Sequence, residues 1–294
     1  MQNDLFVQIR DNMGNLSKGH KKIAEYILEH YEKAAYATAA KLGTTVGVSE
    51  STVVRFATEL GFSGYPEFQT ALQDIIRNKL TSIQRIEATT DRMNSDDVLE
   101  KILNSDIDKI RKTLEECDKD EFYNAVNTII SAKRIYIVGT RSASALARFL
   151  AYYFNLMFEN ARFINTASMS EMFEQIMRIE QGDVMIGISF PRYSKQTAKA
   201  LNFASENGAR VIAITDSKNS PIAESATHTL LAKSDMASFV DSLVAPMSLI
   251  NALIIAIGIK KQDEIKKNFE CLEDIWDKYD VYEKHSDDEE IKLL

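Results

Sequence analysis

The amino-acid sequence predicts an all-α N-terminal domain followed by an α/β domain, in which a parallel five-stranded sheet is flanked by helices. Up to about residue 75, apolar residues recur at intervals of three and four without sustained alternation, as on one face of a helix. After Lys133, short β-branched runs alternate with helical stretches, which is typical of right-handed βαβ units. A chain of 294 residues is long enough for two such domains.

Changes in composition divide the chain into four predicted segments. Residues 1–77 form the helical domain, and residues 78–125 form a charged, amphipathic helical linker. Residues 126–265 form the α/β domain, and residues 266–294 form a last helix with an acidic tail. The five strands are expected at Arg134–Val138, Ala161–Ile164, Asp183–Ser189, Arg210–Thr215 and Thr227–Leu231. Near-continuous apolar runs in several of them indicate strands that are buried on both faces.

The overall charge argues against a protein that binds nucleic acid through a general positive surface. The formal net charge is -8 and the isoelectric point is about 5.2. Residues 1–79, however, contain nine Lys or Arg and nine Asp or Glu, so the first segment is neutral. Any contact with nucleic acid must therefore be made by a few placed residues in this segment.

The two cysteines and the N-terminus predict a cytoplasmic protein. Cys117 and Cys271 lie far apart without metal-ligand neighbours, which indicates reduced thiols and no metal site, and no cofactor is expected. The N-terminus lacks a basic start followed by an apolar run, so no secretory signal is expected. The apolar stretch Val240–Ile259 contains Asp241 and Pro246, which favours a buried core helix over a membrane span.

The stretch Thr38–Phe56 has the pattern of two helices joined by a tight turn. Gly47 permits the positive φ that such a turn requires, and Ser49 is suited to cap the helix that follows. Ala39 and Ala40 are small at positions where two helices could approach each other closely. The pattern predicts that the N-terminal all-α domain is a helix-turn-helix domain.

The second helix of this motif is expected to present its start to a duplex. With Val53, Phe56 and Leu60 facing inward, the residues between them face outward near the helix start that enters a major groove. Arginine can pair with guanine, and Ser and Thr hydroxyls can meet phosphates or base edges. The predicted DNA-binding residues are Ser49, Ser51, Thr52, Arg55 and Lys41, with Lys18, Lys21 and Lys22 as further phosphate anchors. The same helix pair could instead be a protein-interaction module.

Two loops of the α/β domain carry hydroxyl and basic groups where a strand gives way to a helix. One loop follows the first strand and the other follows the third, so both lie at the carboxyl ends of parallel strands. Backbone N–H groups at a helix start and nearby hydroxyls suit a phosphate or sulfate group. The predicted ligand-binding residues are Gly139, Arg141, Ser142, Ser144, Ser189, Arg192, Ser194 and Thr197. The alternative is that these residues are only helix caps and solvated surface.

Taken together, these motifs resemble the RpiR/MurR-type regulators, which join a helix-turn-helix domain to a sugar isomerase (SIS) domain. The resemblance covers nearly the whole chain. The residues that carry it are Gly47–Ser49, Thr52–Phe56, Leu60–Phe62, Tyr65–Phe68, Gly139–Ser144, Ser189–Thr197, Ile214–Ser217, Ser220–Ala223, and the stretch from Ser238–Phe239 through Asn251–Leu253. It implies that Ser142, Ser144, Ser189, Ser194 and Thr197 bind a phosphosugar. Pro191–Arg192 replaces the Ser-Gly pair that is usual in the family.

The resemblance implies a transcriptional regulator of sugar or amino-sugar catabolism, rather than an enzyme. Its expected partners are double-stranded operator DNA and a phosphorylated sugar, and a homodimer or tetramer would present paired reading heads to paired half-sites. No membrane partner is expected. One alternative is a sugar-phosphate isomerase with an accessory helical domain, for which Glu171, Glu174 and His228 are candidate proton-transfer groups, although no spacing pairs an acid with a base. Another is an adaptor that binds a phosphosugar and recruits a protein.

Overall fold

The computed structural model describes residues 5–77, 83, 86, 97–234 and 240–282. The chain divides into two compact units, Met1–Lys109 with Ser234–Ser242 and Ile110–Lys233 with Leu243–Leu294. Most of the first part of the predicted linker, the Ser238–Phe239 mark and the predicted acidic tail lie outside the described residues.

The first unit contains a cluster of short helices that confirms the predicted all-α fold. Its helices are α1 (Leu5–Asn12), α2 (Lys18–Glu29), α3 (Tyr31–Ala34), α4 (Ala39–Val46), α5 (Glu50–Glu59) and α6 (Tyr65–Arg77). An aromatic cluster closes their core, since the ring of Phe68 packs against the rings of Phe56, Phe62 and Tyr65 at centroid distances of 5.8, 5.4 and 6.0 Å. Burial raises the pKa of Tyr65 to about 12, so its hydroxyl stays protonated and donates to the carbonyl oxygen of Ala37 at 2.7 Å.

Side-chain caps begin three of these helices. The hydroxyl oxygens of Ser17, Thr38 and Ser49 accept from the backbone N–H groups of His20, Lys41 and Thr52, respectively. Each cap provides a partner for an N–H group that a helix start otherwise leaves unbonded. The caps expected at Ser17 and Ser49 are therefore confirmed.

The second unit is built on a parallel sheet with the strand order β2-β1-β3-β4-β5. Its strands are β1 (Ile135–Gly139), β2 (Ala161–Ile164), β3 (Val184–Ile188), β4 (Arg210–Thr215) and β5 (His228–Leu231). Its helices are α9 (Lys119–Ile130), α10 (Ala143–Met157), α11 (Met169–Ile176), α12 (Lys195–Glu206), α13 (Val244–Lys260) and α14 (Gln262–Lys278), and α8 (Val98–Glu116) ends in this unit. All five strands lie within one residue of their predicted bounds.

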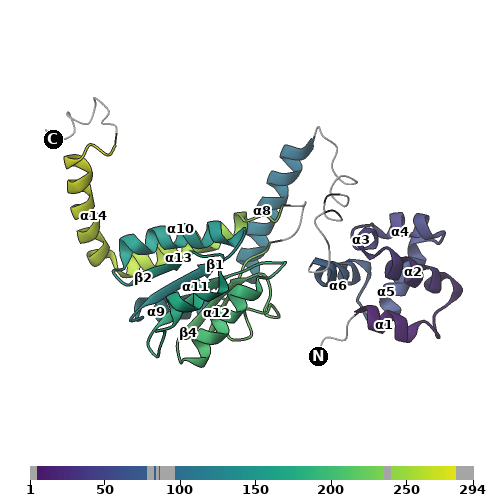
Figure 1. Ribbon diagram of the computed structural model, residues 1–294. Helices are drawn as coiled ribbons and strands as arrows, with labels where there is room; N and C mark the ends of the chain where they lie inside the picture. Colours follow the sequence, from purple (N-terminus) through teal and green to yellow (C-terminus); the bar gives the residue numbers. More distant parts are fainter. Residues whose placement is uncertain (1–4, 78–82, 84–85, 87–96, 235–239, 283–294) are drawn as a thin grey trace. The chain divides into compact units, whose positions relative to one another are not determined.

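Helices cover both faces of the sheet (Figure 1). Ile135 and Ile137 of β1 pack into a core shared with α9, α10 and α13, whereas Tyr136 and Val138 pack into a core shared with α11 and α12. Because β1 and β3 are buried along their whole length, every side chain on them can be apolar. This explains why the sequence shows near-continuous apolar runs there.

Helix α13 is one of these core helices. Leu253 and Ile257 are fully buried, as expected for the apolar stretch. In the described part of the chain no single helix is long and apolar enough to cross a membrane, and α13 with α14 meets the criterion only as a pair bent by 99°.

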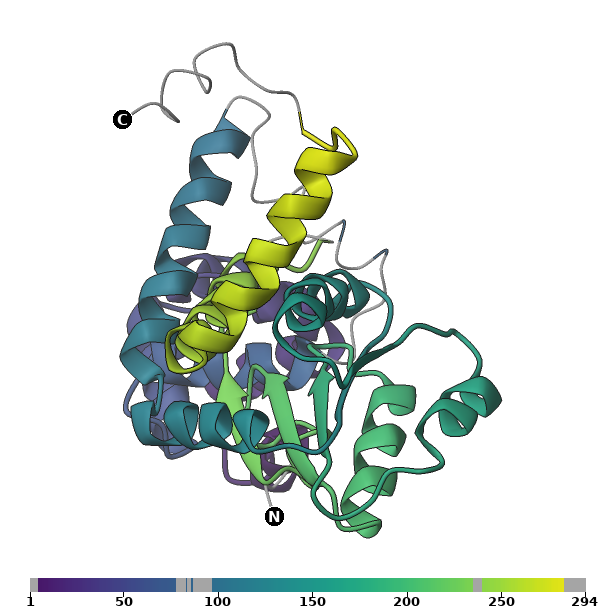
Figure 2. The same cartoon turned by 90° about the vertical axis from the view of Figure 1, so that its left-hand side faces the viewer.

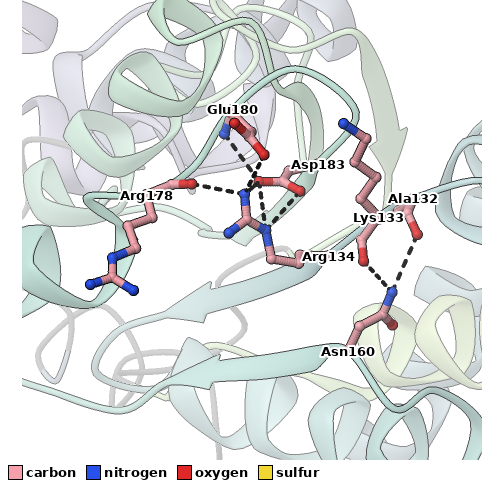
Figure 3. A network of polar contacts seen from close by, with 7 residues as sticks. All are labelled: Ala132, Lys133, Arg134, Asn160, Arg178, Glu180 and Asp183. Atoms are coloured by element: carbon pink, nitrogen blue, oxygen red, sulfur yellow. Dashed lines mark hydrogen bonds and ion pairs between the residues drawn. The ribbon is translucent and has the colours of Figure 1, made fainter.

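An ion-pair network closes the amino edge of the sheet (Figure 3). The carboxylate of Asp183, which has no exposed surface, lies 2.8 Å from the Nη2 atom of Arg134 and 3.1 Å from its Nε atom. The same carboxylate accepts from the backbone N–H of Glu180 at 3.0 Å, and the Arg134 Nη2 also donates to the Arg178 carbonyl oxygen at 2.8 Å. The hydrogen bond to Asp183 raises the pKa of Arg134 further above its usual range. The network therefore ties the start of β1 to the chain that enters β3.

We expect Asp183→Ala to lower the free energy of unfolding by about 3 kcal/mol, because it removes the buried partner of the Arg134 guanidinium. Urea unfolding of both variants would measure this. The matched control is Glu180→Gln, which changes a carboxylate that is 64% exposed on the same guanidinium and should cost less than about 0.5 kcal/mol. Equal losses in the two variants would contradict this assignment.

Candidate functional site

The first candidate site lies on α4, α5 and the turn between them. Gly47 ends α4 in the left-handed conformation with φ 73°, as the sequence predicts. The Val48 N–H then donates to the Gly43 carbonyl oxygen at 2.8 Å, and Ser49 caps α5. These contacts hold the start of α5 at a defined angle to α4.

The turn into α5 passes close to Gly43 of α4, a position for which the sequence pattern predicts no such contact. A Cβ atom at Gly43 would lie 2.8 Å from the Val48 carbonyl oxygen and 3.3 Å from the Glu50 nitrogen. Ala39 is buried as expected, but Ala40 is exposed, so the expectation of close packing at Ala40 is wrong. The sequence did offer a signal for the close contact at Gly43, because a glycine inside a short helix, four residues before Gly47, is unfavourable unless packing requires it.

The outward face of α5 agrees with the helical spacing. Val53, Phe56 and Ala57 are buried. Ser51, Val54, Arg55 and Thr58 are exposed, as are Ser49 and Lys41, whereas Thr52 is half-buried. The methyl group of Thr52 explains its position, because a Cβ atom at Gly19 of α2 would lie 3.3 Å from it. Four of the five predicted DNA-binding side chains are thus exposed.

Hydroxyl groups gather at the start of α5. The Ser49 Oγ lies 2.9 Å from the Ser51 Oγ and 2.8 Å from the Thr52 Oγ1. One turn later, the Arg55 Nε donates to the Ser51 carbonyl oxygen at 3.2 Å. A helix start with hydroxyls and a nearby guanidinium favours an anionic group because the helix dipole is positive there. The remaining predicted anchors Lys18 and Lys22 are exposed on α2, and Lys21 is half-buried.

The second candidate site lies at the carboxyl edge of the sheet in the second unit. The loop after β1 turns at Arg141, which is exposed and has φ 59°. Ser142 and Ser144 lie at the start of α10, where Ser142 is exposed and its side chain makes no cap bond. Gly139 is required here, because a Cβ atom would lie 2.8 Å from the Ala143 carbonyl oxygen. The loop therefore places the start of α10 close to the end of β1. Its first serine, Ser142, is exposed to solvent.

The loop after β3 forms a chain of hydroxyl contacts. The Ser194 N–H donates to the Ser189 Oγ at 3.1 Å, and the Thr197 N–H donates to the Ser194 Oγ at 3.2 Å. Ser189 and Thr197 are buried, and Arg192 is exposed. Each serine hydroxyl accepts in these bonds, so its own proton remains available to donate to a ligand oxygen.

The structure brings the two loops together, as the sequence predicts, but through a residue outside the predicted set. The Thr140 Oγ1 lies 3.4 Å from the Thr197 Oγ1 and joins the start of one loop to the helix after the other. A carboxylate also lies at this edge: the Tyr193 hydroxyl donates to Asp216 Oδ1 at 2.7 Å, and the Thr215 Oγ1 donates to it at 3.3 Å. Thr215 and Asp216 lie in the stretch Ile214–Ser217 that carries the family resemblance, but they are not among the predicted ligand-binding residues, although they follow a strand end at the same edge.

The three candidate proton-transfer groups of the isomerase alternative contact side chains of the surrounding elements. Glu171 accepts from Thr166 Oγ1 at 2.5 Å, and Glu174 accepts from Ser170 Oγ at 3.0 Å within α11. The His228 Nε2 lies 3.0 Å from the Thr128 Oγ1, on the side where β5 meets α9. His228 thus belongs to a different part of the unit from the two glutamates.

Comparison with known families supports the division into two kinds of domain. Residues 3–79 match the family described as "Helix-turn-helix domain, rpiR family", and residues 128–256 match the SIS domain. An uncharacterized HTH-type transcriptional regulator of Haemophilus influenzae is 29% identical over 74% of this chain and 75% of its own. The HTH-type transcriptional regulator HexR of Escherichia coli is 26% identical over 92% of this chain and 95% of its own.

A solved structure has the same fold. The NanR protein of Vibrio vulnificus, in complex with ManNAc-6P, aligns with a TM-score of 0.56 at 22% identity, over 92% of this chain and 98% of its own. The likeness spans both the helical and the α/β parts of the chain.

We expect Gly43→Ala to lower the free energy of unfolding of the first unit by about 1–3 kcal/mol, because the added methyl group meets backbone that has to shift. Thermal unfolding monitored by circular dichroism would measure it. Gly14→Ala is the control: nothing lies within 4 Å of its added Cβ atom, so the change should stay within about 0.5 kcal/mol. A tolerated Gly43→Ala would show that α4 and α5 are not held by this contact.

Proposed function

We propose that this chain, which belongs to the RpiR family of helix-turn-helix transcriptional regulators with a SIS domain, controls sugar or amino-sugar catabolism in response to a phosphorylated sugar. In this proposal the first unit reads double-stranded operator DNA. The second unit binds the effector and has no catalytic role. The observation that carries the proposal is the meeting of two hydroxyl-bearing loops at the carboxyl edge of the sheet, joined by Thr140 and Thr197.

The geometry of α5 supports DNA reading. In the helix-turn-helix mode, the second helix enters the major groove and its first residues contact base edges. Here Ser51 and Arg55 are exposed near that start. Arg55 supplies a group that can read guanine, and the hydroxyls supply bonds to phosphate. Because the first 79 residues carry balanced charge, affinity for DNA would depend on these placed contacts.

The chemistry of the loops supports a phosphorylated ligand. Ser142 and Ser144 stand at one helix start, and Ser194 caps another, so backbone N–H groups and hydroxyls are available for phosphate oxygens. Arg141 and Arg192, one in each loop, supply positive charge. The NanR structure holds ManNAc-6P, which makes a phosphorylated amino sugar the first effector to test.

The second unit also offers a route from the effector to the rest of the chain. Lys233 follows β5, at the same edge of the sheet as the two loops. Its N–H donates to the Thr113 Oγ1 of α8 at 2.9 Å, and its Nζ atom lies 2.6 Å from the Glu116 carboxylate. Effector binding can change operator affinity only if the effector binds two arrangements with different affinity. We propose that effector binding displaces the segment around Lys233 and thereby shifts α8 from one arrangement to the other.

We expect Arg55→Ala to reduce the preference for operator over unrelated duplex by about 10- to 100-fold, since one bidentate pair with a base is lost. Binding would be measured at several salt concentrations with a duplex selected from a random pool by the unmodified chain. The control is Arg10→Ala, which removes an exposed arginine from α1 of the same unit. Unchanged discrimination in Arg55→Ala would remove Arg55 from the reading face.

The effector site has a separate test. Ser142→Ala with Ser144→Ala should weaken phosphosugar binding roughly 10- to 100-fold, because two donors to a charged group are removed, while operator binding persists. Thermal shift with ManNAc-6P and other phosphorylated sugars would measure this, because a ligand that binds the folded state raises its stability. Ser205→Ala, an exposed serine of α12, is the control. An unchanged response would move the site elsewhere, and turnover of the sugars would favour the isomerase.

A further inference from the structure

Helix α14 carries an apolar stripe that its own chain covers only in part. The helix has 17 residues and none of them is buried. Its apolar residues are spaced alternately by four and three, which is the heptad spacing of helices that pack side by side. The residues of this stripe are Ile265, Phe269, Leu272, Trp276 and Tyr279, the last directly after the helix end.

Only the first part of the stripe meets the body of the second unit. Ile265 packs against the core that α10 and α13 share, and the Asn268 Nδ2 donates to the Leu156 carbonyl oxygen at 3.2 Å. Beyond these contacts α14 extends away from the sheet (Figures 1 and 2). Tyr279 is 68% exposed there, and Ile275 beside the stripe is 44% exposed. Phe269, Leu272 and Trp276 are half-buried, and the Trp276 ring lies 5.2 Å from that of Tyr282, so the rest of the second unit covers the stripe only in part.

A helix with this composition is stabilised by a partner on its apolar side. Most helical stability in proteins comes from packing of the apolar face and not from helix propensity. We propose that α14 pairs with α14 of a second copy of this chain in antiparallel orientation. Phe269 then packs against the second copy's Leu272, and Ile265 against its Trp276, so that four apolar layers form across the pair.

Charge decides between the two orientations. In the antiparallel pair Lys266 flanks the stripe opposite the second copy's Glu273, and the two-fold symmetry repeats this pair of opposite charges. Both residues are exposed in the single chain. A parallel pair would bring Lys261 towards the second copy's Lys266, and like charges at such flanking positions disfavour pairing. The antiparallel arrangement is therefore the one that the sequence of α14 matches.

Leu272→Glu in the full chain should raise the dimer dissociation constant at least about tenfold, because it places a charge in the apolar seam. Sedimentation would measure it. Trp276 is the only tryptophan of the chain and lies in the stripe, so its fluorescence reports on this contact even if other surfaces hold two copies together. Its emission should shift to the red and acrylamide should quench it more strongly. Unchanged Trp276 emission and quenching would overturn the proposal.

A charge exchange tests the orientation. Lys266→Glu alone and Glu273→Lys alone each create two like-charged pairs and should weaken association about three- to tenfold, while the double variant restores it. The matched control is Lys267→Glu, which makes the same change one residue further on, away from the stripe, and should leave association unchanged. Failure of the double variant to restore association would overturn the antiparallel arrangement, as would an effect of Lys267→Glu equal to that of Lys266→Glu.

Discussion

The geometry of both candidate sites depends on glycines at which a helix and a neighbouring element approach so closely that no side chain fits between them. In the first unit the turn between α4 and α5 passes within 2.8 Å of the space a Cβ atom would fill at Gly43. In the second unit α10 begins equally close to Gly139 at the end of β1. On β3, a Cβ atom at Gly187 would overlap the side chain of Leu201 from α12. Each glycine thereby lets a helix lie directly beside the residues that carry the chemistry.

Much of this arrangement could be predicted because its causes are local. The strands were located from β-branched runs buried on both faces, and the turn at Gly47 and the cap at Ser49 follow from residue types that only a few backbone conformations favour. The inward and outward sides of α5 follow from helical spacing alone. The predicted ligand-binding residues fall at the two loop positions that parallel strands bring to one edge, because topology, not side-chain detail, sets that edge.

What could not be predicted depends on contacts between distant parts of the chain. Thr140 meets Thr197 across 57 residues of sequence. Both lie in stretches that carry the family resemblance, but no local pattern pairs one with the other. Asp216 follows β4 at the carboxyl edge, but its contact with Tyr193 joins it to the loop after β3 across 23 residues of sequence. The contacts of Lys233 with Thr113 and Glu116 join the end of α8 to the α/β unit. Composition alone placed these α8 residues in a linker, because a charged helix surface looks the same whether or not a distant loop binds it.

The two edges of the sheet show why the hydroxyl groups at one of them are available for a ligand. At the amino edge, Asp183 accepts several hydrogen bonds and is paired with Arg134, so its capacity as an acceptor is largely used. At the carboxyl edge, Ser189 and Ser194 use their oxygens as acceptors and retain a proton each. A phosphate group offers only acceptors at its ionised oxygens, so the proposed ligand would accept from these serine hydroxyls and not from Asp183. In the proposed function, fold stability and ligand binding therefore depend on opposite ends of the same strands.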